Sequence, residues 1–260
     1  MAKASDWGRF SRLDTEASDT SIIATSQGVA GSGKSHFWLT APGPIAYFLF
    51  DPGGLKGLRN NPLFGEKEIM VRDYCGDLNI GKLPEDERVS RSVDIMAQFQ
   101  EDWDTAVRLA RTLVVDKETM LWEMLRYAHD EVKSPVPKNF QDLNLMYRGW
   151  IQDAEVKERN LGFIRDVKDT WGKIGVNREG KPQLGFTGRM VPEGQKYLTG
   201  NVQINLSHRW DDDEREFCVT ILEKCRLGTP KKLMGREFPD LDFPTLGLML
   251  YPKSDPETWS

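Results

Sequence analysis

The stretch from residue 21 to residue 35 decides the fold of this chain. It reads Ser21-Ile22-Ile23-Ala24-Thr25-Ser26-Gln27-Gly28-Val29-Ala30-Gly31-Ser32-Gly33-Lys34-Ser35. A short apolar strand runs into glycines, and the segment from Gly28 to Ser35 satisfies the pattern G-x-x-x-x-G-K-[ST] in full. In this pattern backbone N–H groups surround phosphates, the lysine reaches the β- and γ-phosphates, and the serine hydroxyl binds Mg²⁺. The residues therefore predict a loop that binds ATP with magnesium, with Lys34 as its catalytic cation.

A second element of such a site is a carboxylate at the end of a neighbouring strand. Thr112-Leu113-Val114-Val115-Asp116 is an apolar strand closed by an aspartate. We expect Asp116 to hold the magnesium together with Ser35. The alternative is an aspartate that only caps the following helix, and both roles are compatible.

Strands and helices alternate through the first two thirds of the chain. Apolar strands are predicted at 21–25, 45–50, 69–71, 112–116 and 160–164, and helices at 34–40, 92–110, 119–129 and 143–157. Two alternating strands follow near 202–206 and 217–222, with the acidic turn 211–214 between them. This order predicts an α/β fold with a mainly parallel sheet and a C-terminal antiparallel extension.

Length and composition favour one soluble domain. The chain has 260 residues, of which 39% are hydrophobic and 29% charged, with a net charge of −5. We expect an N-terminal arm at 1–20, the core domain at 21–250 and a C-terminal tail at 251–260. The longest apolar runs are too short for a membrane helix, and three cysteines without metal-ligand spacing suit a reducing compartment. A cytoplasmic protein is the expectation.

The order of these elements resembles the RecA-like core. More narrowly, the chain is similar to phage-encoded AAA-type nucleotide-binding proteins, including RecA-like single-strand annealing ATPases. The resemblance rests on the phosphate loop, Phe48-Leu49-Phe50-Asp51, the strand ending in Asp116, Leu121-Trp122-Glu123, and the segment from Phe186 to Gly194. It implies an ATPase that works as a homo-oligomer, a ring or a filament, with nucleotide at the subunit interfaces.

Two basic residues extend this resemblance. The strand Thr220-Ile221-Leu222-Glu223-Lys224-Cys225-Arg226 is similar to the RecA-like strand that ends in two basic residues separated by one. The resemblance implies that Lys224 and Arg226 reach the nucleotide of a neighbouring subunit and offset charge on its γ-phosphate. The alternative is a solvated basic strand end.

The resemblance fails at the water-activating glutamate. RecA-like proteins place it just after the aspartate of the second strand, where this chain has Asp51-Pro52-Gly53-Gly54. Glu118 is the candidate substitute, although a first-turn glutamate is also favoured by the helix dipole alone. Slow hydrolysis, hydrolysis that depends on assembly, or the use of Asp51 are the other readings.

A basic, glycine-rich segment from 168 to 196 is the candidate contact with single-stranded DNA. Its basic and aromatic side chains would neutralise phosphates and stack on bases; the candidate contacts are Lys173, Arg178, Lys181, Phe186, Arg189 and Lys196. A solvated surface hairpin is the plain alternative.

The residues and the resemblance together predict a RecA-like ATPase that acts on single-stranded DNA in phage recombination or replication. Two other functions stay open. A small-molecule kinase would use Arg178 and Arg189 as a lid, but no acceptor site is recognisable. A non-hydrolysing, nucleotide-gated binding module is favoured by the missing glutamate after Asp51.

Overall fold

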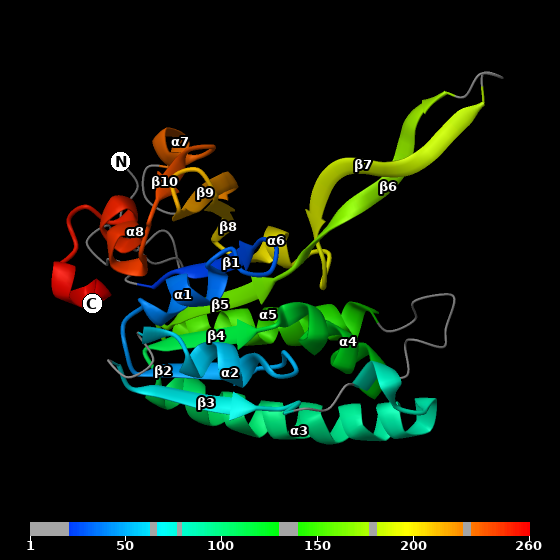
Figure 1. Cartoon of the computed structure of the whole chain (residues 1–260). Helices are drawn as coiled ribbons and strands as arrows, with labels where there is room; N and C mark the ends of the chain where they lie inside the picture. The colour runs from blue at the N-terminus through cyan, green and yellow to red at the C-terminus, as the bar shows by residue number, and fades with distance from the viewer. Residues whose placement is uncertain (1–20, 63–66, 77–79, 130–139, 177–180, 226–229) are drawn as a thin grey trace, which may run out of the picture.

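The computed structural model describes residues 21–62, 67–76, 80–129, 140–176, 181–225 and 230–260. The first half contains β1 (Ile23–Gln27), α1 (Lys34–Leu39), β2 (Ile45–Leu49), α2 (Gly54–Arg59), β3 (Ile69–Asp73), the 3-10 helix η3 (Ile80–Lys82), α3 (Glu85–Leu109), β4 (Thr112–Asp116) and α4 (Glu118–Ala128). The second half contains α5 (Phe140–Val156), β5 (Asn160–Arg165), β6 (Val167–Val176), β7 (Pro182–Pro192), α6 (Leu198–Asn201), β8 (Ile204–Asp211), β9 (Glu216–Cys225), α7 (Pro230–Leu233), β10 (Glu237–Pro239), α8 (Phe243–Leu250) and η4 (Pro256–Trp259). Figure 1 shows a layered body from which the hairpin of β6 and β7 projects.

The central sheet positions the site. Within the described residues it has eight strands in the order β10-β9-β8-β1-β5-β4-β2-β3. The strands from β8 to β3 pair in parallel, and β9 and β10 add an antiparallel extension. The predicted α/β class, mainly parallel with a C-terminal antiparallel extension, is confirmed. Because parallel strands end at the same edge, the residues that follow β1, β2, β4 and β5 meet there.

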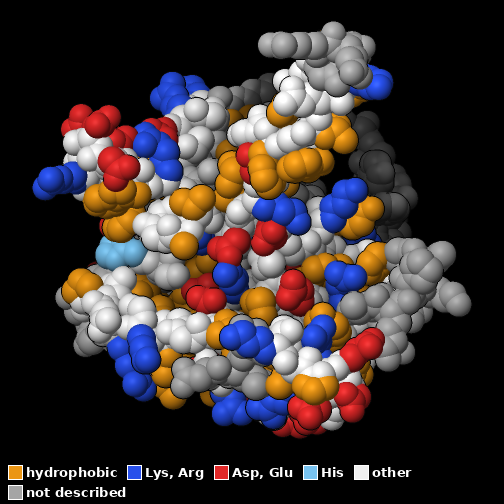
Figure 2. Space-filling view, turned by 45° about the vertical axis from the view of Figure 1, so that its right-hand side comes forward, with side chains coloured by type: hydrophobic (Ala, Val, Ile, Leu, Met, Phe, Trp, Pro, Cys, Tyr) orange, Lys and Arg blue, Asp and Glu red, His pale blue; other side chains and the backbone are white. Residues whose placement is uncertain are grey.

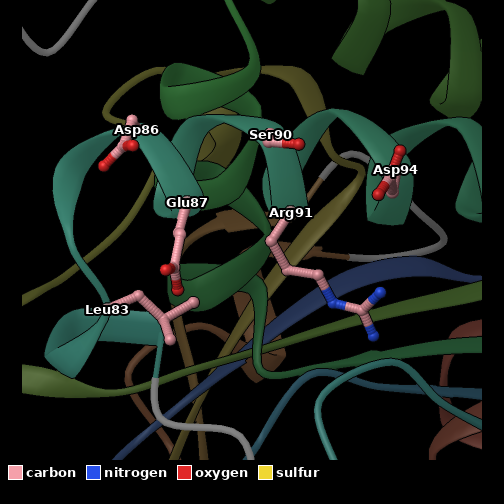
Figure 3. Close-up of a pocket in the computed structure, with 6 residues that line it drawn as sticks. All are labelled: Leu83, Asp86, Glu87, Ser90, Arg91 and Asp94. Atoms are coloured by element: carbon pink, nitrogen blue, oxygen red, sulfur yellow. The ribbon is translucent and has the colours of Figure 1, made fainter.

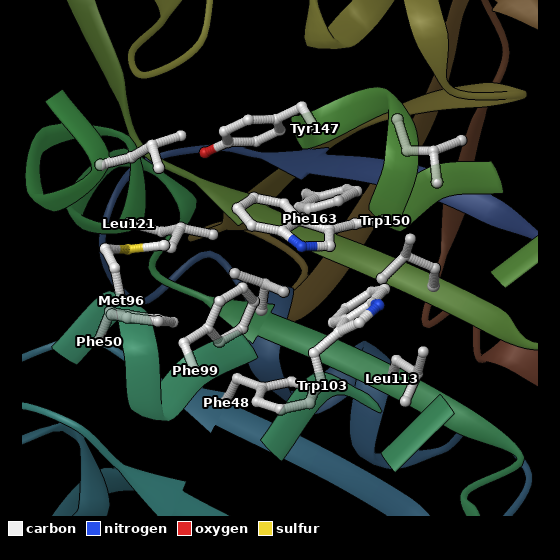
Figure 4. Close-up of a cluster of buried hydrophobic side chains, with 14 of the residues drawn as sticks. Phe48, Phe50, Met96, Phe99, Trp103, Leu113, Leu121, Tyr147, Trp150 and Phe163 are labelled. Carbon is white, nitrogen blue, oxygen red and sulfur yellow. The ribbon is translucent and has the colours of Figure 1, made fainter. Parts of the chain in front are cut away.

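Each face of the sheet is covered by helices. Leu113 and Val115 of β4 pack with side chains of α3, α4 and α5, whereas Val114 between them packs with side chains of α1 and α8. This alternation follows from the two-residue period of a strand. Figure 4 shows the aromatic cluster on the first face, in which Trp103 and Trp150 are buried. None of the described helices combines the length and the apolar character needed to cross a bilayer.

The structure differs from the sequence-based elements in three places. Helix α3 begins at Glu85, one and a half to two turns before the predicted start. The basic segment, for which no strands were assigned and a surface hairpin was the alternative, forms two long strands, β6 and β7. The boundary predicted at residue 250 separates side chains that pack together, because Trp259 is fully buried against Phe243 and Tyr251. The predicted N-terminal arm, 1–20, lies outside the described residues.

Candidate functional site

The phosphate loop connects β1 to α1 in a backbone path that requires glycine. Gly31 and Gly33 have φ angles of +78° and +87°, in the left-handed region that favours glycine. A Cβ on Gly28 would lie 2.4 Å from the carbonyl oxygen of His208 on the neighbouring β8. The loop is therefore seated directly against the sheet, and both packing and backbone conformation require glycine in it.

Lys34 folds back over this loop. Its Nζ donates hydrogen bonds to the carbonyl oxygens of Gly28 and Val29, both at 2.7 Å. Burial lowers the pKa of Lys34, and the nearby carboxylates of Asp166 and Asp116 oppose that shift. The ammonium is thus held at the mouth of the loop, among groups that favour its charged form.

Ser35 and Asp116 meet across the sheet edge. The Ser35 hydroxyl donates to Asp116 Oδ2 at 2.9 Å, and the Tyr47 hydroxyl donates to the same oxygen at 2.5 Å. Burial raises the pKa of Asp116, while these two hydrogen bonds oppose the shift. A hydroxyl beside a carboxylate is the oxygen pair that Mg²⁺ prefers, so the two predicted metal-binding residues are in mutual contact.

The loop also carries an unmet polar group. Ser32 is buried, and its hydroxyl has no hydrogen-bond partner among the described residues. Buried hydroxyls normally have a partner. This orphaned group, the glycine-only backbone and the Ser35–Asp116 pair together fit a bound nucleotide with magnesium.

Three further charged residues meet at the same edge, and sequence reasoning missed two of them. The Nζ of Lys117, the residue after Asp116, lies 2.5 Å from Asp166 Oδ2 and 3.7 Å from Asp51 Oδ1. Asp166 also lies 3.8 Å from Lys34 Nζ. Their positions at strand ends are the feature that could have identified them from the sequence. Lys117 and Asp166 directly follow β4 and β5, and Asp51 lies two residues after the end of β2.

Glu118 lies in a buried polar cluster. Its side chain is fully buried and forms an ion pair with Arg165 Nε at 3.0 Å. Its Oε1 accepts hydrogen bonds from the Tyr147 hydroxyl at 2.9 Å and from the backbone N–H of Gln195 at 3.0 Å. Burial raises the pKa of Glu118, and Arg165 opposes that shift. These contacts explain Glu118 as a structural carboxylate, and its catalytic role stays a prediction without geometric support.

The same cluster anchors the projecting hairpin. Arg165 donates to the carbonyl oxygens of Glu193 and Gln195, just beyond the end of β7. Gly194 packs so closely on Glu118 that a Cβ there would lie 2.1 Å from its Oε2. The base of the hairpin is therefore fixed to β5 and to the start of α4, beside Asp116.

The hairpin exposes large apolar and basic side chains. Trp171 and Phe186 are opposite each other in the register, are 63% and 67% exposed, and their rings meet edge to face at 5.0 Å. Lys173, two residues along β6, shares their face. Figure 2 shows hydrophobic side chains gathered along this arm, with acidic and basic side chains intermingled on the body below it.

The other residues predicted to contact DNA lie partly on or beside the hairpin and partly outside the described residues. Arg189 in β7 and Lys196 just after it are exposed, and Lys181 directly precedes β7. Arg178 lies outside the described residues. The same holds for Arg226 and for the side chain of Lys224, although Lys224 itself belongs to β9.

A separate hollow lies on the N-terminal turns of α3. Its lining includes the acidic residues Asp86, Glu87 and Asp94 together with Arg91 (Figure 3). None of its lining residues belongs to the phosphate loop or to the strand ends beside it. An acidic lining disfavours phosphate, so this hollow has no part in the nucleotide site.

Comparisons with known proteins show a likeness of fold to solved structures. No protein-family model and no curated protein matches the sequence. The crystal structure of the RadB recombinase superposes with a TM-score of 0.46 at 12% sequence identity, covering 84% of this chain and 86% of that one. At that TM-score and identity the likeness says nothing about what this chain binds, and the function has to be inferred from the geometry of the site.

Proposed function

We propose that this chain is a RecA-like ATPase that binds ATP and Mg²⁺ in the loop from Gly28 to Ser35. The observation that carries the proposal is the joint placement of Lys34, Ser35 and Asp116. Lys34 lies over the loop, and the Ser35 hydroxyl contacts the Asp116 carboxylate at 2.9 Å. When bound, the nucleotide supplies the reactive phosphoanhydride. The chain's own residues supply the Lys34 ammonium, the Ser35–Asp116 oxygen pair that would hold the metal, and the glycine-rich loop around the phosphates.

The direct test is nucleotide affinity. We expect the purified full-length chain to bind ATP in a magnesium-dependent manner, measured by isothermal titration calorimetry. Lys34→Ala should abolish this binding, because its ammonium is the cation closest to the loop. Lys253→Ala, which removes a lysine from the exposed C-terminal segment, is the control and should bind as the wild type does. Equal binding by both variants would contradict the proposal.

We further propose that the hairpin of β6 and β7 binds single-stranded DNA. Exposed aromatic rings stack on bases, and exposed basic residues neutralise phosphates. Trp171, Phe186 and Lys173 combine both chemistries on one face of the arm. The setting in phage recombination or replication, and the oligomer with nucleotide at its interfaces, come from the sequence resemblance and belong to the same proposal.

DNA binding is tested by fluorescence anisotropy of a labelled oligonucleotide. Replacing Trp171 and Phe186 by alanine should weaken binding by about 1–3 kcal/mol per stacked base, with a melting temperature close to that of the wild type. Trp210→Ala is the matched control, because Trp210 is a partly exposed aromatic residue on β8. An unchanged affinity in the double variant would remove the hairpin from the DNA-binding surface.

A second candidate function is a nucleotide-gated module that binds ATP without hydrolysing it. The specific observation in its favour is the burial of Glu118 against Arg165, Tyr147 and Gln195. Asp51 is the alternative carboxylate, since its side chain is 43% exposed and lies 3.7 Å from Lys117 Nζ. Phosphate release measured with and without single-stranded DNA separates the two, and Asp51→Asn identifies the base if hydrolysis occurs.

A further inference from the structure

Two lysines converge on one carboxylate at the mouth of the phosphate loop. Lys117 Nζ lies 2.5 Å from Oδ2 of Asp166, and Lys34 Nζ lies 3.8 Å from Oδ1 of the same residue. Lys117 begins at the end of β4 and Asp166 follows β5, the strand that separates β4 from β1. The two ammonium groups therefore come from opposite sides of β5 and meet in front of it.

The surroundings of Lys117 are those of a functional cation more than of a surface ion pair. Its side chain is only 27% exposed, and Asp51 lies on its other side at 3.7 Å. The Lys117 ammonium thus lies between the carboxylates of Asp166 and Asp51, and it shares Asp166 with Lys34.

An anion that engages Lys34 lies within reach of Lys117. Lysine carries its charge on a flexible four-carbon stem, and both stems already reach the same carboxylate. The lysine of a phosphate loop contacts the β- and γ-phosphates. Asp166 is thus a protein carboxylate that competes with those phosphates for both lysines.

We propose that Lys117 is a second, same-chain phosphate-binding lysine that selects the triphosphate, and that Asp166 opposes it by competing for the same charge. The proposal rests on the proposed function of the loop. ATP carries a charged γ-phosphate at a position where ADP has no group. A second cation at that position therefore favours ATP over ADP. Lys117 would add charge from within the subunit, independently of any residue from a neighbour.

Opposite effects of the two partners distinguish this role from a structural ion pair. Lys117→Gln removes the charge and keeps most of the side chain's length, so ATP affinity should fall about tenfold while ADP affinity stays within about twofold. Asp166→Asn removes the competing charge and keeps the shape, so ATP affinity should rise. If the ion pair served stability alone, neither variant would discriminate between ATP and ADP, and the two variants would not change ATP affinity in opposite directions.

The experiment is isothermal titration calorimetry of ATP and ADP, each with Mg²⁺, on the full-length wild type and its variants. The ratio of ATP to ADP affinity is the readout, because both nucleotides meet the same folded protein even if a variant is less stable. Lys253→Gln is the control. Lys253 is an exposed lysine of the C-terminal segment, and its loss should leave the ratio unchanged.

The outcomes separate the two proposals. A lower ratio for Lys117→Gln with a higher ATP affinity for Asp166→Asn supports the inference. Equal losses for ATP and ADP, no loss in Lys117→Gln, or weaker ATP binding by Asp166→Asn would overturn it while leaving the loop as the nucleotide site. If the wild type binds neither nucleotide, the proposed function fails and the inference fails with it.

Discussion

At the scale of single residues, contacts inside the protein explain features that a motif would assign to ligand binding alone. Gly28 is one case, because a side chain there would collide with the backbone of β8. His208 is another. Its Nε2 lies 3.0 Å from the Ser26 hydroxyl oxygen, and its ring packs edge-on against Phe37 beneath the loop. The phosphate loop thus packs against a buried histidine that no sequence motif singles out.

His208 predicts a specific dependence of stability on pH. Burial, with a contribution from Lys34, lowers the pKa of His208 to about 3. The unfolded chain takes up a proton near pH 6.5 while the folded chain does not, so the free energy of unfolding falls as pH drops below 6.5. Between pH 7 and pH 5 the histidine should remove about 2 kcal/mol.

Urea denaturation at the two pH values checks this expectation. His208→Gln has no proton to take up at this position, so its stability should fall less between pH 7 and pH 5 than that of the wild type. The comparison cancels the titration of all other groups. Identical pH dependence in both proteins would show that His208 can be protonated in the folded state.

At the scale of elements, the buried Glu118–Arg165 pair joins α4 to β5 and to the base of the hairpin. A buried ion pair is weak evidence of net stabilisation, but removal of one partner leaves an uncompensated charge. Glu118→Gln should therefore lower the free energy of unfolding by about 3–5 kcal/mol. The measurement is chemical denaturation at constant pH.

A double variant controls for the loss of the glutamate itself. Replacing both Glu118 and Arg165 by methionine removes the two charges together and should recover part of the stability lost in Glu118→Gln. A stable Glu118→Gln variant that has lost only phosphate release would instead give Glu118 the catalytic role that the sequence predicts.

The sequence-based predictions and the structure agree most closely for features that are encoded by residues adjacent in the sequence. The loop from Gly28 to Ser35 and the strand ending in Asp116 are local patterns, and the mainly parallel sheet follows from the alternation around them. Lys117 and Asp166 were not predicted, because their contact depends on β5 lying beside β4. The hairpin of β6 and β7 was predicted only as an alternative, because glycines interrupt both strands and most of their side chains are exposed.

At the scale of the whole molecule, Lys224 and Arg226 provide the test of the predicted assembly with nucleotide at its subunit interfaces. If they act on the nucleotide of a neighbouring subunit, replacing either by alanine should abolish ATP hydrolysis and leave nucleotide binding by the monomer nearly intact. Phosphate release and calorimetry measure the two properties on the same sample. Full hydrolysis in both variants would exclude an action between subunits.

Mixing provides the control for this prediction. A Lys34→Ala subunit has a damaged loop and intact basic residues, whereas an Arg226→Ala subunit has the reverse. If the basic residues act between subunits, a mixture of the two inactive proteins should regain part of the activity. Activity that never returns in mixtures would place Arg226 in its own subunit's site or in folding.

The projecting hairpin also has a mechanical consequence. Strand β6 has ten residues, which corresponds to a length of about 33 Å at the usual rise of a strand. Its root is Asp166, the residue that Lys34 and Lys117 share. A tilt of about 10° at that root would sweep the far end of a strand of this length through about 6 Å. Because this root lies beside the phosphate loop, a small displacement there would be magnified several-fold at the far end of β6.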